Sequence, residues 1–147
     1  MNADTACDVV EIQMLIAAYA AALDEKDYDA LDDIFQPSAL FVYHGTDGSQ
    51  KQGSFKEMKP WIKEVVDEFP VTQHLMGLPV IRVDGHSATA RSTLFNPLMV
   101  QEGDAPSTML LVGAYYRDVL AKIDGRWWIT ERYDTGTWDL SCASKGS

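Results

Sequence analysis

Basic residues are scarce in this sequence. Its 147 residues include 12 Lys and Arg against 22 Asp and Glu, which gives a formal net charge of −10. Nucleic acids and anionic membranes are bound through Lys and Arg that neutralise phosphates, so this charge balance argues against both kinds of partner. Cysteine is scarce too. Cys7 and Cys142 lie near opposite ends of the chain without CxxC spacing, so we expect a reduced cytoplasmic setting.

Long hydrophobic runs and targeting signals are lacking. The longest apolar run, Ile12 to Leu23, is interrupted by Gln13 and is shorter than the ~20 residues that span a bilayer. The residues before it carry acids and no Lys or Arg, whereas a signal peptide needs a positive first region. We therefore expect no membrane association.

Several catalytic signatures are also absent. The sequence contains no GxSxG, Walker loop, GxGxxG or HExxH, which argues against a serine hydrolase, an NTPase, a dinucleotide-binding fold and a zinc protease. The three histidines are scattered without matching Cys or carboxylate spacing. We therefore expect neither a metal site nor a cofactor.

What remains is the composition of an ordinary globular domain. Hydrophobic residues make up 46% of the chain and charged residues 23%, which excludes disordered and fibrous classes. The length favours a single domain over residues 1–147, large enough to bury a core without a disulfide or metal.

Three helices are predicted in the first half of the chain. Apolar residues in the first recur at the spacing of one helical face. Pro37 should stop the second helix. Glu57 follows Ser54 by three residues, a capping-box pattern for the start of the third. The three helices are expected over Ile12–Leu23, Tyr28–Phe35 and Ser54–Phe69.

Strands dominate the rest. Asp84-Gly85 and Asp124-Gly125 are typical hairpin turns, and the segment from Gln101 to Ser107 is a polar loop. This order predicts an α+β domain, in which a curved, mixed but mostly antiparallel sheet wraps around the three helices as a cone with an internal pocket. The strands are expected over Ala39–Tyr43, Val71–Val83, Ser87–Val100, Met109–Ile123 and Arg126–Trp138.

Asp24 and His74 are the leading candidates for chemistry. His74 lies within a predicted strand, whereas His44 and His86 lie at turns. An Asp–His pair fixes an imidazole tautomer and raises its basicity, which makes a general base near neutral pH. The alternative is that Asp24 is a solvated helix-end acid and His74 a structural histidine.

Other polar residues have two interpretations each. Tyr19 and Tyr43 are either core residues or hydrogen-bond donors to a substrate oxygen, and Asn96 is a polar contact inside the cone or marks a bulge before Pro97. Strict alternation puts Trp128, Thr130 and Arg132 on one strand face. Arg132 then either enters the cone to bind an anion or pairs with Glu131 or Asp134.

The chain resembles the SnoaL-like branch of the nuclear transport factor 2-like, or cystatin-like cone, superfamily over about residues 8 to 138. The resemblance lies in Tyr19-x4-Asp24, the segment from Leu31 to Pro37, the His74 strand, and the segments Val83–Arg91 and Ile123–Ile129. Asp24 and His74 are similar to the dyad of scytalone dehydratase, bile-acid 7-alpha-dehydratase and hexachlorocyclohexane dehydrochlorinase. Tyr19 matches a tyrosine of the bile-acid enzyme, Arg132 an arginine of the dehydrochlorinase, and Asn96 an asparagine of scytalone dehydratase.

The resemblance implies a cofactor-independent lyase or isomerase, dehydratase-like, acting on a hydrophobic small molecule. The alternatives are a polyketide-type cyclase and a non-catalytic cone that binds a small molecule or a protein. The expected catalytic residues are Asp24, His74, Tyr19 and Arg132. The expected substrate-binding residues are Tyr43, Asn96, Trp61, Leu94, Tyr115 and Trp128.

The outer face of the sheet is expected to join copies of the chain. By alternation, Trp127, Ile129 and Tyr133 lie on the face of the last strand opposite Arg132. Soluble monomers rarely expose more than a few hundred Å² of contiguous apolar surface. We therefore expect a homodimer or homotrimer, and the resemblance agrees.

Overall fold

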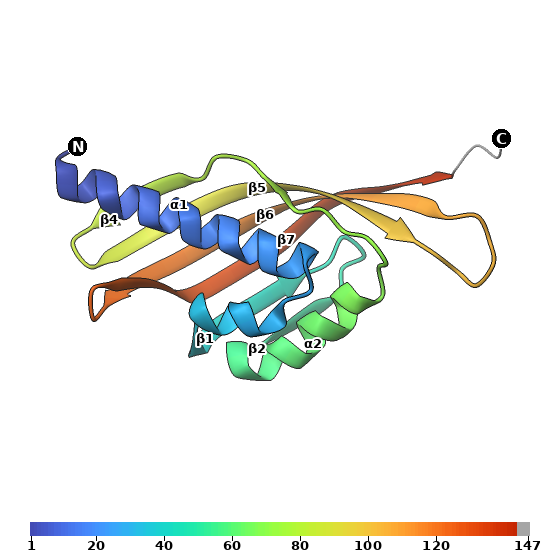
Figure 1. Ribbon diagram of the computed structural model, residues 1–147, viewed down its shortest axis with the longest axis horizontal. Helices are drawn as coiled ribbons and strands as arrows, with labels where there is room; N and C mark the ends of the chain where they lie inside the picture. The colour runs from blue at the N-terminus through green and yellow to red at the C-terminus, as the bar shows by residue number, and fades with distance from the viewer. Residues whose placement is uncertain (144–147) are drawn as a thin grey trace.

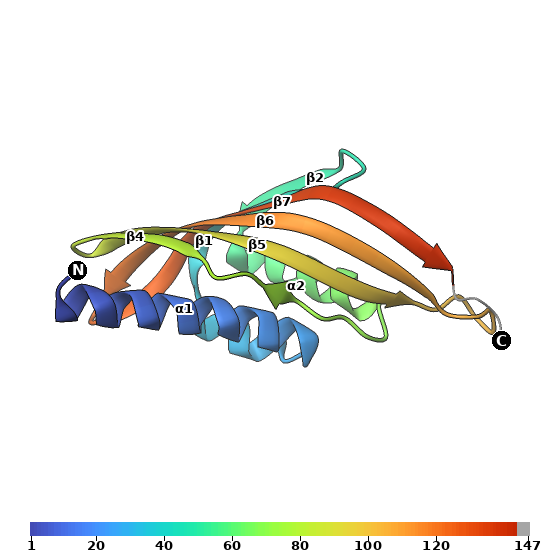
Figure 2. The same ribbon diagram turned by 90° about the horizontal axis from the view of Figure 1, so that it is seen from above.

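One curved, open sheet of seven strands carries the helices on its concave side (Figures 1 and 2). The computed structural model describes residues 1–143. The strand order is β2-β1-β7-β6-β5-β3, and β4 also pairs with β5. Strands β1 and β7 run parallel and the other pairs antiparallel. The elements are α1 (Ala3–Asp24), η1 (Tyr28–Asp33), β1 (Phe35–His44), β2 (Gln50–Ser54), α2 (Phe55–Asp67), β3 (Leu75–Met76), β4 (Val80–Asp84), β5 (Ser87–Val100), β6 (Thr108–Ile123) and β7 (Arg126–Ala143).

Both long helices begin with side-chain caps. Asn2 accepts a hydrogen bond from the Thr5 N–H, 2.8 Å away, at the start of α1. The capping box predicted for Ser54 and Glu57 is present at the start of α2.

By length and composition α1 is apolar enough to cross a membrane, but a core helix has the same composition. Its buried residues pack into the core: Ile12, Ile16, Tyr19, Ala22 and Leu23.

The second predicted helix is shorter than expected, because Phe35 already belongs to a strand. The turn η1 is a 3₁₀-helix that ends at Asp33. The Phe35 ring stacks on Phe55 at 4.5 Å between centroids, which fixes it in the core. Pro37 does not stop a helix but lies within β1, where the register with β7 shifts between Phe35 and Leu40, so no ladder N–H is needed there.

Two other strand predictions need correction. The segment Val71–Val83 forms two short strands, β3 and β4, because Gly77 and Pro79 interrupt it. Strand β2 was not predicted, since its sequence QKQGS lacks apolar alternation and its first three residues are exposed. The hairpin turns at Gly85 and Gly125 are as predicted, with φ of +58° and +79°.

A bulge in β7 decides which side chains face the helices. Leu120 pairs with Ile129, but the preceding Val119 pairs with Glu131, so Thr130 is an extra residue. Alternation therefore changes phase at Thr130. Trp127 and Ile129 lie in the core with Arg132, and the prediction that Arg132 shares a face with Trp128 is wrong.

Candidate functional site

A pocket of about 450 Å³ lies between α1, α2 and the concave face of the sheet. This volume is within the range of small-molecule sites. Its walls are largely apolar, and the polar side chains among them come from α1, the β1–β2 hairpin, the segment before β3, and strands β5, β6 and β7. The polar lining residues used below are Tyr19, Tyr43, Thr72, His74, Asn96, Tyr116, Asp134 and Asp139.

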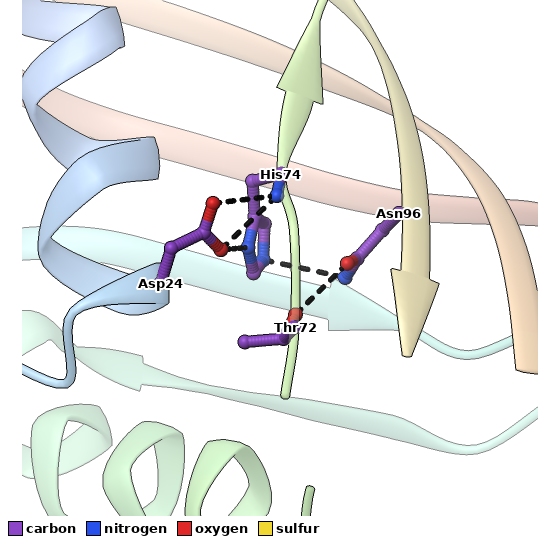
Figure 3. A network of polar contacts seen from close by, with 4 residues as sticks. All are labelled: Asp24, Thr72, His74 and Asn96. Atoms are coloured by element: carbon purple, nitrogen blue, oxygen red, sulfur yellow. Dashed lines mark hydrogen bonds and ion pairs between the residues drawn. The ribbon is translucent and has the colours of Figure 1, made fainter. Parts of the chain in front are cut away.

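Asp24 and His74 belong to a network of polar contacts (Figure 3), in which His74 lines the pocket. Asp24 is the last residue of α1, and His74 directly precedes β3. The His74 Nδ1 atom lies 2.6 Å from Asp24 Oδ1, so the expected contact between the two side chains is present. The imidazole is 6% exposed and the carboxylate 28%, and the ring therefore has little contact with bulk water.

Asn96 and Thr72 complete the network and indicate the histidine tautomer. The Asp24 carboxylate accepts from Nδ1–H, which leaves Nε2 as an acceptor. The Asn96 Nδ2 atom lies 3.4 Å from His74 Nε2, and the Thr72 hydroxyl donates to Asn96 Oδ1 at 2.9 Å. The contact to Nε2 is long, so this nitrogen is weakly bound and available to a substrate proton.

Arg132 does not enter the pocket, contrary to prediction. Its guanidinium forms two hydrogen bonds of 2.7 Å to Asp118, and both side chains are fully buried. It lies 4.1 Å from the Tyr19 ring centroid and 4.5 Å from that of Tyr116. Burial alone would lower the pKa of Arg132, but Asp118 raises it overall. The anion that Arg132 binds is thus Asp118, not a ligand.

Tyr19 is a core residue that also lines the pocket. It is buried among aromatic rings, edge-on to Phe35 and Tyr116 at 5.8 and 5.6 Å between centroids, and it also lines the pocket. Burial raises the pKa of Tyr19 to about 12. Its hydroxyl therefore stays protonated and can donate a hydrogen bond to a ligand oxygen.

Asp134 is a pocket residue that sequence reasoning considered only as an ion-pair partner of Arg132. Its backbone pairs with Tyr43 on β1 and with Tyr116 on β6, so it lies between two tyrosines. Burial raises the pKa of Asp134 to about 7, although Arg132 opposes this. The two-residue spacing from Arg132 was a usable signal, because it places both residues on one strand face.

The remaining predicted site residues divide into two groups. Tyr43, Trp61 and Leu94 line the pocket as expected, as do His74 and Asn96. Tyr115 and Trp128 do not. Their neighbours Tyr116 and Trp127 are buried in the core, so alternation turns Tyr115 and Trp128 outwards, where Arg91 and Arg126 stack on them.

Solved structures share the fold. A putative scytalone dehydratase from Novosphingobium aromaticivorans superposes with a TM-score of 0.78 at 19% identity, covering 100% of this chain and 95% of the other. A nuclear transport factor 2-like superfamily protein from Salmonella enterica gives 0.76 at 19%, covering 97% and 96%. A hexachlorocyclohexane dehydrochlorinase gives 0.75 at 14%, covering 95% and 92%. The fold is thus nuclear transport factor 2-like.

Sequence relatives agree with the structures. Rv2910c, an uncharacterised protein of Mycobacterium tuberculosis, is 36% identical over 128 residues, which cover 87% of this chain and 84% of that protein. A probable cyclase of Gibberella zeae, FGR4, is 33% identical over 73 residues, covering 45% and 49%. The model of the SnoaL-like domain matches residues 4–133. This chain therefore belongs to the SnoaL-like family.

Proposed function

We propose that this protein is a cofactor-independent lyase or isomerase that acts on a hydrophobic ketone through His74. The observation that carries the proposal is the 2.6 Å contact between Asp24 and the ring of His74 beside a largely apolar pocket. An apolar pocket with a few convergent polar groups is the usual form of a small-molecule site.

In the proposed reaction, His74 Nε2 removes a proton from the carbon next to the carbonyl group. The C–H electron pair forms a carbon–carbon double bond, and the carbonyl oxygen takes on negative charge. Asp24 stabilises the imidazolium, while the Tyr19 hydroxyl donates to the charged oxygen. In a dehydration the C–O bond then breaks as the carbonyl re-forms, and the hydroxyl leaves as water with the proton from His74. Positioned acid–base catalysis of this kind contributes about 10²–10⁴ in rate.

The activities named for the similar proteins support this reaction class. Dehydration and dehydrochlorination each break a bond to carbon after or during loss of a neighbouring proton, the step assigned here to His74. The probable cyclase FGR4 favours a second candidate, in which the carbanion made by the same proton removal closes a carbon–carbon bond. Both candidates begin with the same proton transfer.

That shared step can be measured directly. 1-Tetralone, a bicyclic ketone, exchanges its C2 protons for deuterium when a base removes them, and NMR in D₂O follows the exchange. The wild-type protein should accelerate exchange, whereas His74→Gln should lose about 10²-fold or more of this acceleration. His86→Gln is the matched control, because His86 lies exposed in a turn. Dehydration is followed separately with 3-hydroxy-1-tetralone, which yields fluorescent 1-naphthol.

Binding and turnover must be separated in the same experiment. Calorimetry on a panel of bicyclic and tricyclic ketones identifies those that bind, and only these are tested for exchange. Exchange that is equal in wild type and His74→Gln would contradict the proposal. Binding without any exchange in the wild type would instead show a non-catalytic cone.

A further inference from the structure

Asp134 occupies a different part of the pocket wall from the Asp24–His74 pair. It lies on β7, whereas Asn96, the neighbour of His74, lies on β5 with β6 between them. Neighbouring strands are about 5 Å apart, so two steps across the sheet separate the backbones by about 10 Å or more. Asp134 and His74 therefore meet different parts of a ligand.

The surroundings of Asp134 favour its neutral form. In the part of the chain that the structure describes, its carboxyl group has no hydrogen-bond partner, although the residue is partly buried and lines the pocket. The positive charge of Arg132 lowers the pKa of Asp134, but by less than burial raises it, and two of the Arg132 nitrogens are already paired with Asp118. The titratable and charged groups that face Asp134 are Tyr19 from α1, Tyr43 from β1, Tyr116 and Asp118 from β6, and Arg132 from β7.

The neighbouring tyrosines do not remove this preference. Burial, together with Asp134, raises the pKa of Tyr43 above its ordinary value, and burial raises that of Tyr116 well above it. Both phenols thus stay neutral. The pKa of Asp134 itself is raised to about 7 by burial, so near neutral pH a proton on this carboxyl group can be donated to a ligand, as buried neutral acids do in other active sites.

We propose that Asp134, as a neutral acid between Tyr43 and Tyr116, donates a hydrogen bond to an oxygen atom at the end of the ligand remote from His74. The ligand class is then a neutral, mainly apolar molecule with oxygen atoms at two ends. The inference rests on the proposed function in one respect: it takes this pocket to be the ligand site. It does not need His74 to be a base.

Ligand binding should take up a proton if Asp134 binds as a neutral acid. The probe is 6-methoxy-1-tetralone, which carries an oxygen at each end and does not titrate near neutral pH. Its Kd, measured by calorimetry, should rise about 30-fold from pH 5.5 to pH 8.5, as linkage to one group with a pKa of about 7 requires. In Asp134→Asn the amide still donates, so the Kd should stay near the low-pH value at every pH.

Two controls separate this inference from the proposed function. Asp139→Asn changes another pocket carboxylate, one that already accepts a hydrogen bond from Thr46, and should keep the 30-fold change. His74→Gln should also keep it, even though it loses proton exchange on 1-tetralone. A wild-type Kd that does not vary with pH, or the same variation in Asp134→Asn, would overturn the inference.

A measurement on the wild type avoids reliance on the folding of a variant. Carbon-13 NMR of the Asp side chains follows the carboxyl group of Asp134 through its titration. The midpoint should lie near pH 7 in the free protein and should rise when 6-methoxy-1-tetralone binds. A midpoint near 4, the ordinary value for Asp, or no change on binding would contradict the proposal.

Discussion

Asp24 holds His74 by its backbone and by its ring. The His74 N–H donates to both carboxylate oxygens, at 3.0 and 2.8 Å, while Nδ1 lies 2.6 Å from one of them. One carboxylate thus fixes both the position of the strand residue and the direction of its side chain. Such dual anchoring keeps the imidazole in one geometry, as the proton transfer proposed for His74 requires.

Asp24→Asn should weaken the anchoring of His74 while keeping a side chain of the same size at position 24. In either orientation the amide NH₂ faces a donor, the His74 N–H, and the neutral amide no longer stabilises an imidazolium. We expect deuterium exchange of 1-tetralone to fall about 10²–10⁴-fold, with little change in ligand affinity. Glu25→Gln, at the next and exposed position, should leave exchange unchanged. If Asp24→Asn exchanges at the wild-type rate, the pair is structural only.

Local patterns predicted much of the fold but not the phase of β7. Helical periodicity, the Ser54 capping box and the Asp-Gly turns each depend on a few neighbouring residues, and each is present in the structure. The bulge at Thr130 depends on how β7 pairs with β6, which no local pattern records. For that reason Trp128 was assigned to the pocket.

The candidate site likewise contains residues that could be predicted from the sequence and one that could not. Asp24 and His74 were identifiable because His74 is the one histidine in a predicted strand and because the family resemblance covers both. Asp134 acquires its properties from distant elements: Tyr43 on β1, Tyr116 on β6 and the ion pair of Arg132 with Asp118. Only the folded chain brings these groups together.

A double-mutant cycle should separate the contributions of Arg132 and Asp118 to the free energy of unfolding. Arg132→Met leaves the Asp118 carboxylate buried without a partner, and we expect it to lower the free energy of unfolding by about 3–5 kcal/mol. Replacing both, as Arg132→Met with Asp118→Leu, should recover most of this loss. Urea unfolding at pH 7 measures Arg132→Met, Asp118→Leu and the double variant. A double variant that is less stable than Arg132→Met would contradict this account.

Asp134 should make stability depend on pH in an unusual direction. Its pKa is raised to about 7 in the folded chain, against about 3.9 when unfolded. Its contribution is therefore fully present below pH 4 and is lost as pH rises to 7, by at most about 1.4 kcal/mol per unit. Asp134→Asn has no such loss, so it should be more stable than wild type at pH 8 and nearly equal near pH 4. Equal unfolding curves at pH 8 would disprove this.

We still predict that copies of the chain associate through the outer face of the sheet. The apolar residues on that face, however, differ from those expected from the sequence. Trp127 and Ile129 are buried in the core, not on the outer face. The apolar row that is exposed crosses four strands in register: Leu75 pairs with Phe95, Phe95 with Gly113, and Gly113 with Trp138.

The apolar side chains of this row are open to solvent. Leu75, Phe95 and Trp138 are 54%, 39% and 46% exposed, and the rings of Phe95 and Trp138 lie 6.1 Å apart. Because contiguous apolar patches are rarely left open to water, we expect another copy of the chain to cover this row in a closed dimer or trimer.

Light scattering should give two or three times the 16.3 kDa of one chain. Trp138→Asp should yield monomers, while Thr89→Asp, exposed elsewhere on β5, should not. A wild-type mass of one chain at micromolar concentration would refute this assembly.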